Sequence, residues 1–264
     1  MKKIISFVCV AILFVSCHTH SFVPQSQNVP LFTDKHEFRV STGLGLRAGN
    51  IQLAYSPIKY LGIQTNIMAS TTQLYLIPEV AIGAYYPIQK KFIFELYGGY
   101  AYCDYRYINN KELYRDLLFG GYAGYYKFNI AMQANRYFIQ PNIGIKINKY
   151  INLALSFKAS YWDFNNYSYN SEFWIFKDRD ALHSSLRKKE SLNFNAASQY
   201  TFEPAITFCA GGKDHKVLLQ TGFYSYYYEG NTVAKPYRTL PIFIRLGYSG
   251  SFDFNSFKQK KSLN

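Results

Sequence analysis

Apolar and polar residues alternate with a period of two along most of the chain from His36 onward. The clearest run covers residues 150–162, where Ile151 and Leu155 lie on one face and Lys158 lies on the other. Such alternation predicts β-strands, and this run is well above the usual strand length of about five or six residues. No helical stripe of ten or more residues interrupts the pattern. The chain is therefore expected to be all-β.

The connections between the expected strands alternate between short and long. Tight turns are expected at 57–60, 87–90, 148–149 and 211–214, and long connections at 106–135, 163–198 and 229–237. Short turns on one side and long loops on the other are typical of transmembrane barrels of bacterial outer membranes. We therefore expect a transmembrane up-and-down antiparallel β-barrel, with the N-terminal segment and the tight turns on the periplasmic side. A periplasmic lipocalin-like barrel is the alternative architecture.

The strand count follows from the same connections. Ten strands result if 106–135 is one external excursion, and an even number is what a closed bacterial barrel requires. Residues 117–133 could themselves form a hairpin, so eight and twelve strands are the alternatives.

The first residues are typical of a secretory leader. Lys2 and Lys3 precede an apolar run that is too short to span a bilayer as a helix but suits a signal peptide. The run ends at Ser16-Cys17, which is similar to the lipobox of bacterial lipoproteins, whose cysteine becomes the acylated first residue. We expect a signal peptide over 1–16 and lipid attachment at Cys17, with ordinary signal cleavage as the alternative.

The composition predicts the boundaries between the N-terminal tether, the barrel and the C-terminal tail. Residues 17–35 are rich in Pro, Gln, Ser and Asn and lack a hydrophobic period, so a lipidated tether is expected there. The barrel is expected over 36–254 and a basic tail over 255–264. Two isolated cysteines inside the barrel, Cys103 and Cys209, are not expected to form a disulfide because they fall near opposite ends of the fold.

The aromatic content and the charge narrow the functional classes. The 264 residues include 26 Tyr and 22 Phe, and 48% are hydrophobic, which excludes a disordered chain. Lys and Arg number 29 against 16 Asp and Glu, a formal net charge of +13. Nucleic acid is not an expected partner of a protein located in the outer membrane. No Gly-rich phosphate loop, CxxC pair or HExxH motif occurs, so neither a cofactor nor a metal is expected.

Three short runs carry a family resemblance: Pro30-Leu31-Phe32-Thr33, Leu53-Ala54-Tyr55-Ser56-Pro57 and Phe138-Ile139-Gln140-Pro141-Asn142-Ile143-Gly144. They resemble strand-and-turn segments of small outer-membrane β-barrel lipoproteins of Bacteroidota-type bacteria, a largely uncharacterised family. The resemblance spans about residues 17–255. It implies a lipid-anchored protein of the cell outer membrane, in contact with outer-membrane lipids and inserted by the barrel assembly machinery. Such barrels often end on an aromatic residue, whereas this chain continues past Phe254 into a basic tail.

Seven ionisable residues fall on the strand face that is expected to line the lumen. They are Arg39, Glu79, Glu95, Lys146, Lys158, Glu203 and Arg245. A buried charge without a partner is costly, so we expect these groups to pair with one another and to plug the barrel. A catalytic or conducting arrangement of the same groups is the alternative.

The longest connection, 163–198, contains two features of interest. An apolar run is expected to pack over the barrel mouth or to contact a partner, because exposed apolar patches mark interaction sites. A short helix is expected over 178–189, ending on a basic cluster that faces lipopolysaccharide phosphates or water. The apolar run is Phe173, Trp174, Ile175 and Phe176, and the basic cluster is Arg187, Lys188 and Lys189.

The expected function is non-enzymatic: a lipid-anchored outer-membrane barrel with a structural or surface-binding role. An envelope hydrolase or lipid-modifying enzyme is one alternative, because His183 lies near Ser184 and Glu190 in the sequence. A narrow pore is the other alternative. No residue of the sequence identifies a ligand or an oligomeric state.

Overall fold

The structure, a computed structural model, describes residues 25–45, 48–70, 76–89, 91–113, 124–176, 184–194, 197–228 and 242–253. The strands are β1 (Glu37–Gly45), β2 (Ala48–Ile58), β3 (Leu61–Ser70), β4 (Leu76–Ile88), β5 (Phe92–Leu113), β6 (Gly124–Lys146), β7 (Ile151–Phe176), β8 (Ser184–Phe194), β9 (Ala197–Gly211), β10 (His215–Phe223), β11 (Ser225–Tyr228) and β12 (Ile242–Asp253). Within these ranges there is no helix that is long and apolar enough to cross a membrane.

Ten of the strands close into an antiparallel ring. The ring runs from β1 to β7 in chain order, continues through β9, β10 and β12, and returns to β1. β11 continues β10 past Tyr224 and pairs with β9, and β8 pairs with β7 beyond the closed wall. The predicted antiparallel barrel of ten strands is therefore confirmed.

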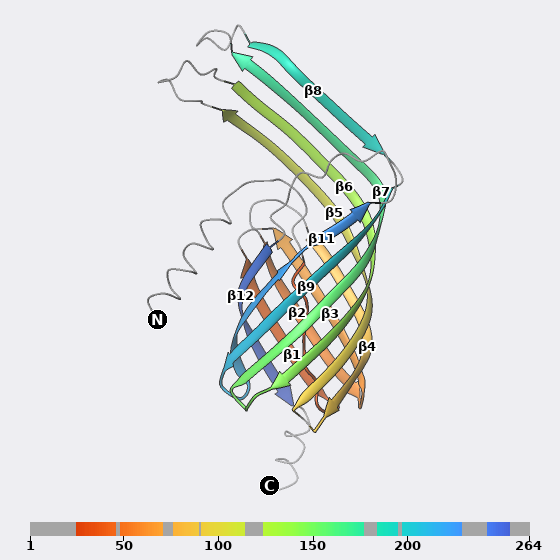
Figure 1. Cartoon of the computed structure of the whole chain (residues 1–264), viewed down its shortest axis with the longest axis vertical. Coiled ribbons are helices and arrows are strands. Elements are labelled where there is room, and N and C mark those ends of the chain that lie inside the picture. Colours follow the sequence, from red (N-terminus) through yellow and green to blue (C-terminus); the bar gives the residue numbers. More distant parts are fainter. Residues whose placement is uncertain are drawn as a thin grey trace, which may run out of the picture.

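The tight turns lie together at one end of the barrel, which we call the turn end (Figure 1). They join β2 to β3, β4 to β5, β6 to β7 and β9 to β10, and they coincide with the turns expected from the sequence. We call the opposite end the long-strand end, because β5, β6 and β7 run far past the other strands there (Figure 1).

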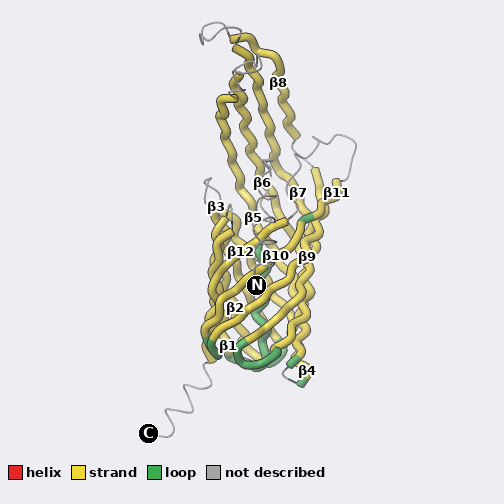
Figure 2. Tube along the Cα trace, turned by 60° about the vertical axis from the view of Figure 1, so that its left-hand side comes forward, coloured by secondary structure: helices red, strands yellow, loops and turns green. Residues whose placement is uncertain are grey.

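A four-stranded sheet projects from the long-strand end, where the sequence predicts loops (Figures 1 and 2). β5 and β6 stay paired out to Leu113 and Gly124, and β7 and β8 stay paired out to Phe176 and Ser184. We call the part of β5–β8 beyond the closed wall the extension. The expected external loops over 106–135 and 163–198 are thus largely paired strands.

The helix expected over 178–189 is wrong for residues 184–189, which belong to β8. Their main-chain groups pair with β7, for example Lys188 with Phe173. The helix prediction rested on local spacing alone, and a sheet partner satisfies the same backbone groups in another way. Residues 177–183 lie outside the described residues.

The two faces of the barrel wall have opposite character. Large apolar side chains point outward, and Ile139 and Ile143 are 51% and 55% exposed. The inward face is polar, with Gln52, Asn66 and Gln140 all buried. This arrangement is the reverse of a soluble lipocalin-like barrel and is typical of a barrel surrounded by lipid.

Aromatic residues border the outer apolar surface. Tyr100, Tyr137, Tyr161 and Tyr200 are cross-strand neighbours on β5, β6, β7 and β9. From Tyr137 on β6 to Ile147, the residue after its end, the chain advances about 25 Å along the barrel axis, at about 3.3 Å per residue and about 40° of tilt. That height matches the apolar band of about 25 Å in known outer-membrane barrels.

Candidate functional site: a lumen filled by the N-terminal segment

Residues 25–33 lie inside the barrel (green inside the ring of strands in Figure 2). Gln25, Gln27 and Phe32 are buried. The expectation of an extended tether over 17–35 is therefore wrong for residues 25–33, which we call the plug. A stretch rich in Pro, Gln, Ser and Asn without a hydrophobic period predicts a tether in water, but the lumen is polar, so polar side chains find partners there.

The wall supplies hydrogen bonds that the plug backbone would otherwise lack. The Gln220 side chain accepts from the Gln27 N–H at 3.0 Å and donates to the Gln27 carbonyl oxygen at 2.9 Å. One side-chain amide thus takes the place of a neighbouring strand. Since a buried backbone group without a partner is costly, this pairing stabilises the plug in the lumen.

Side-chain amides on other strands of the wall also form hydrogen bonds with the plug backbone. Gln52 and Asn66 both donate to the Ser26 carbonyl oxygen at 3.1 Å. Gln140 donates to the Asn28 carbonyl oxygen at 2.8 Å. The plug is therefore bound by β2, β3, β6 and β10, which surround it, rather than along one strand.

Two apolar side chains anchor the plug near the turn end. Leu31 packs against Ile93 and Ala154, and Phe32 packs against Tyr85. The wall is notched where Leu31 lies, because a Cβ added at Gly144 would come within 2.1 Å of a Leu31 methyl carbon. Leu31 has a φ of 53°, a backbone conformation that non-glycine residues seldom adopt. The plug and the wall are thus shaped to one another.

The direction of the plug differs from the sequence-based topology. The Gln25 side chain donates to the carbonyl oxygen of Ile77, at the long-strand end of β4. The Thr33 and Asp34 N–H groups donate to the Glu37 carboxylate, at the turn end. The chain therefore passes through the lumen from the long-strand end to the turn end before β1 begins.

A buried charge cluster lies beside the start of the plug. The Arg136 guanidinium contacts the Glu203 carboxylate, and Lys158 Nζ lies 2.9 Å from a Glu79 carboxylate oxygen. Arg136 also approaches Glu79 at 4.0 Å and donates to the Gln25 side-chain oxygen at 3.0 Å. Two cations and two carboxylates are thus paired, and one of the cations binds the plug as well.

Aromatic rings complete the surroundings of the two cations. Arg136 lies 4.8 Å from the centre of the Trp162 ring, and Lys158 lies 4.4 Å from that of Phe138. Cation–π contacts stabilise charges most strongly where water is excluded. The two cations of the cluster are thus held by aromatic rings as well as by carboxylates.

The structure places all seven predicted lumen residues on the inner face, but it does not bring them into one network. Only Glu79, Lys158 and Glu203 belong to the cluster. Glu95 accepts from the Phe32 N–H at 3.1 Å and from Asn142 at 2.9 Å. Its carboxylate binds the plug rather than a cation.

The other three predicted lumen residues lie apart from the cluster. Arg39 pairs with Glu37 at 2.5 Å, at the turn end. Lys146 donates to the Thr33 hydroxyl at 3.5 Å. Arg245 donates to the Gln52 side-chain oxygen at 3.0 Å, and its Nε and a second terminal nitrogen have no hydrogen-bond partner among the described residues.

Sequence reasoning missed Arg136, the residue that joins the plug to the cluster. Residues up to 135 were assigned to an external loop, so the inward face of β6 was followed only from Gln140 onward. The alternation that places Gln140 and Asn142 in the lumen continues back to Arg136 and predicts its position.

The residues of the expected partner-contact loop come together in the extension. Phe173, Trp174, Ile175 and Phe176 form the end of β7, and Arg187, Lys188 and Lys189 lie on the paired strand β8. Lys189 forms an ion pair with Glu172 at 3.2 Å. The apolar run continues a strand of the projecting sheet, so the backbone does not fold over the barrel mouth. Cys17 and His183 lie outside the described residues.

The described lumen residues bind the plug and one another through hydrogen bonds and ion pairs. No group of three or more His, Cys, Asp or Glu residues in the described part of the chain could hold a metal ion. Cys103 and Cys209 are both free thiols, as expected.

Comparisons with known proteins find a likeness among solved structures. No protein-family model matches the chain, and no curated protein matches it. Among solved structures, the chain is similar to the CymD monoaromatic hydrocarbon channel, with 7% sequence identity and a TM-score of 0.22. The match covers 83% of this chain and 89% of that one.

Proposed function

We propose that this protein is an outer-membrane β-barrel whose lumen is closed by its own N-terminal segment, with a structural or surface-binding role and no enzymatic activity. The observation that carries the proposal is the plug, which lies along the lumen and is bound by strands on several sides. A barrel built to conduct would leave this space to water. The narrow-pore alternative is therefore not favoured.

The outer surface supports the membrane location. Apolar side chains cover the wall over a height of about 25 Å, bordered by cross-strand tyrosines, which is the surface that lipid requires. A soluble protein rarely exposes such a continuous apolar surface. With short turns on the periplasmic side, as in other such barrels, the extension projects from the cell surface.

The extension supports the surface-binding role. Past Asp104, β5 has no pairing to β4, so one edge of the projecting sheet is free of a strand partner in the described part of the chain. β8, on the opposite side, pairs only with β7 among the described strands. Free strand edges are a common place for another chain to add a strand.

Conductance tests the closed lumen. We expect the refolded wild type to give no steady current in a planar bilayer. Gly144→Leu should open the lumen by displacing Leu31 from its notch, and a deletion of 25–33 should do the same. Gly98→Leu is the matched control, because Gly98 is exposed on the wall and a Cβ there meets no atom closer than 4.0 Å. A steady open-channel current from the wild type would refute the proposal.

We also propose that Cys17 carries the lipid. Eight peptide steps join Cys17 to Gln25, a reach of at most about 28 Å. Because Gln25 lies near the long-strand end, the proposal places the lipid close to that mouth. Radiolabelled palmitate should enter the wild type and not Cys17→Ala, while Cys209→Ala should label like the wild type. Label that persists in Cys17→Ala would exclude this attachment site.

A further inference from the structure

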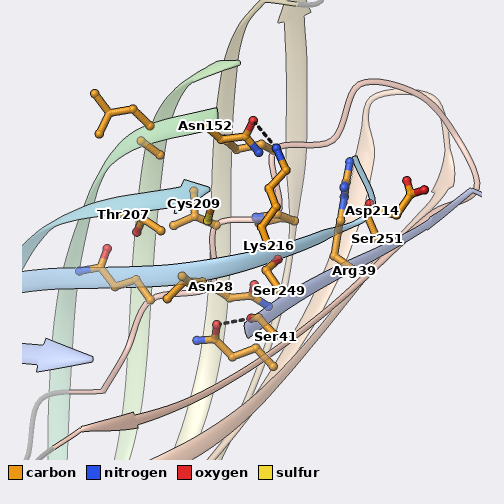
Figure 3. A pocket seen from close by; sticks show the side chains of 18 residues that line it. Asn28, Arg39, Ser41, Asn152, Thr207, Cys209, Asp214, Lys216, Ser249 and Ser251 are labelled. Carbon is orange, nitrogen blue, oxygen red and sulfur yellow. Dashed lines mark hydrogen bonds between the residues drawn. The ribbon is translucent and has the colours of Figure 1, made fainter. Parts of the chain in front are cut away.

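A crevice with both polar and apolar lining lies between the plug and the wall near the turn end (Figure 3). Residues 27–31 of the plug form one side, and the other sides come from β1, β2, β7, β9, β10 and β12 and from the turn before β10. Its volume is about 40 Å³. A single water needs about 10–15 Å³ by this measure, so the crevice has room for a small polyatomic ion in place of water.

Two cations line this crevice. Figure 3 shows Arg39 and Lys216 extending in the same direction from β1 and β10, the two neighbours of β12. Lys216 donates to the Lys149 carbonyl oxygen at 3.0 Å and to the Asn152 side-chain oxygen at 3.2 Å. Both acceptors are neutral, so no carboxylate within ion-pair distance balances the Lys216 charge in the described part of the chain.

Glu37 balances the charge of Arg39, whereas Lys216 has no ion-pair partner among the described residues. Glu37 pairs with Arg39, but its other oxygen already accepts from Thr33 and Asp34, and Arg39 Nε keeps no partner. Asp214 lies in the exposed turn at the rim, where water screens its charge. Arg39 Nε is thus a buried donor that an oxygen atom of a ligand could satisfy.

Neutral hydroxyl donors also line the crevice, and apolar side chains such as Leu153 and Leu218 cover the remainder. Ser249 and Ser251 contribute hydroxyl groups from β12, and Thr207 contributes another from β9. Hydroxyl groups beside two cations are suited to tetrahedral and planar oxyanions, since charge-assisted hydrogen bonds are the strong ones.

We propose that this crevice binds a small oxyanion of the phosphate class between Arg39 and Lys216. The ligand is either free phosphate or the phosphate of a lipid headgroup at the rim of the barrel. The site rests on the proposed position of the plug in the lumen, because residues 27–31 form one of its walls.

Equilibrium dialysis with inorganic phosphate tests the site. The protein is held in nanodiscs of zwitterionic lipid, and chloride keeps the ionic strength constant. We expect saturable binding at one site, weakened at least about tenfold by Lys216→Met and retained by Lys216→Arg. Lys213→Met is the matched control, because Lys213 is exposed in the turn beside β10 and its loss removes the same charge from the same end.

A second arm separates the two sources of the phosphate. Native mass spectrometry of nanodiscs that contain anionic phospholipid, without added phosphate, should show one retained lipid that Lys216→Met releases if the headgroup is the ligand. Failure of both arms would overturn the proposal, and so would equal weakening by Lys213→Met and Lys216→Met. Phosphate binding by a barrel that conducts would refute the closed lumen and leave the oxyanion site standing.

Discussion

Arg136 shows how one residue couples the wall to the plug. Its guanidinium contacts Glu203, donates to the Ser160 hydroxyl at 2.9 Å and donates to Gln25 at 3.0 Å. Its side chain has no exposure to solvent. A buried cation of this kind is tolerated only because carboxylates lie beside it.

Removal of Glu203 should therefore destabilise the barrel strongly. We expect Glu203→Ala to cost on the order of 3–5 kcal/mol in the free energy of unfolding, because Arg136 keeps only Glu79, at 4.0 Å, as a carboxylate partner. Urea unfolding in lipid vesicles measures this cost. The double variant Glu203→Ala/Arg136→Met should recover part of it, since the unpaired cation is then gone. A loss below about 1 kcal/mol in the single variant would show that the pair matters little.

Glu95 has a different role in the lumen from Glu203, because it binds the plug and not a cation. Its carboxylate accepts from the Phe32 N–H and from Asn142, with no cation within ion-pair distance among the described residues. The sequence placed Glu95 in the lumen correctly. It could not assign the partner, because period-two alternation gives the face of a strand and not the contact across a barrel.

At the scale of elements, the sequence predicted the closed wall well. The turns that join β2 to β3, β4 to β5, β6 to β7 and β9 to β10 combine Pro, Gly, Asn and Lys with alternation on either side, and both features are local. The extension was missed because residues 106–113 and 167–176 mix Tyr, Asn and Ser, which suit loops and strands alike. Only the pairing with neighbouring strands decides between them.

The extension should be dispensable for folding of the barrel. β7 pairs with β9 as far as Phe164 and with β8 from Tyr167 onward, so the closed wall ends before the extension begins. A deletion of 172–190 should leave the heat-modifiable mobility of the folded barrel on gels intact and abolish its surface interactions.

Two outcomes would contradict this division of roles. A deletion variant that no longer folds would show that β7 and β8 hold the wall together. A variant that folds and keeps every surface interaction would show that the extension is not the binding element. Protease digestion on intact cells establishes beforehand that the extension is outside.

At the scale of the whole molecule, the polar lumen is the reason that a polar N-terminal segment can be buried. In a soluble protein a stretch such as Gln25-Ser26-Gln27-Asn28 belongs at the surface. Inside a membrane barrel the interior is polar, and here the amides of Gln52, Gln140 and Gln220 bind that stretch. The sequence predicted a plugged barrel from its charges, but composition alone could not show that the N-terminal segment is the plug.

A disulfide between plug and wall tests this central claim most directly. Leu31 Cγ lies 3.0 Å from the position of a Cβ at Gly144, which suits a disulfide between cysteines at these positions. In a chain without residues 1–16 that carries Cys17→Ala, Cys103→Ala and Cys209→Ala, mild oxidation of Leu31→Cys/Gly144→Cys should consume both thiols and lower the mass by two hydrogens. The pair Leu31→Cys/Gly98→Cys should keep both thiols, since Gly98 is exposed on the wall. If the Leu31→Cys/Gly144→Cys pair also stays fully reactive toward a thiol reagent, the N-terminal segment does not fill the lumen.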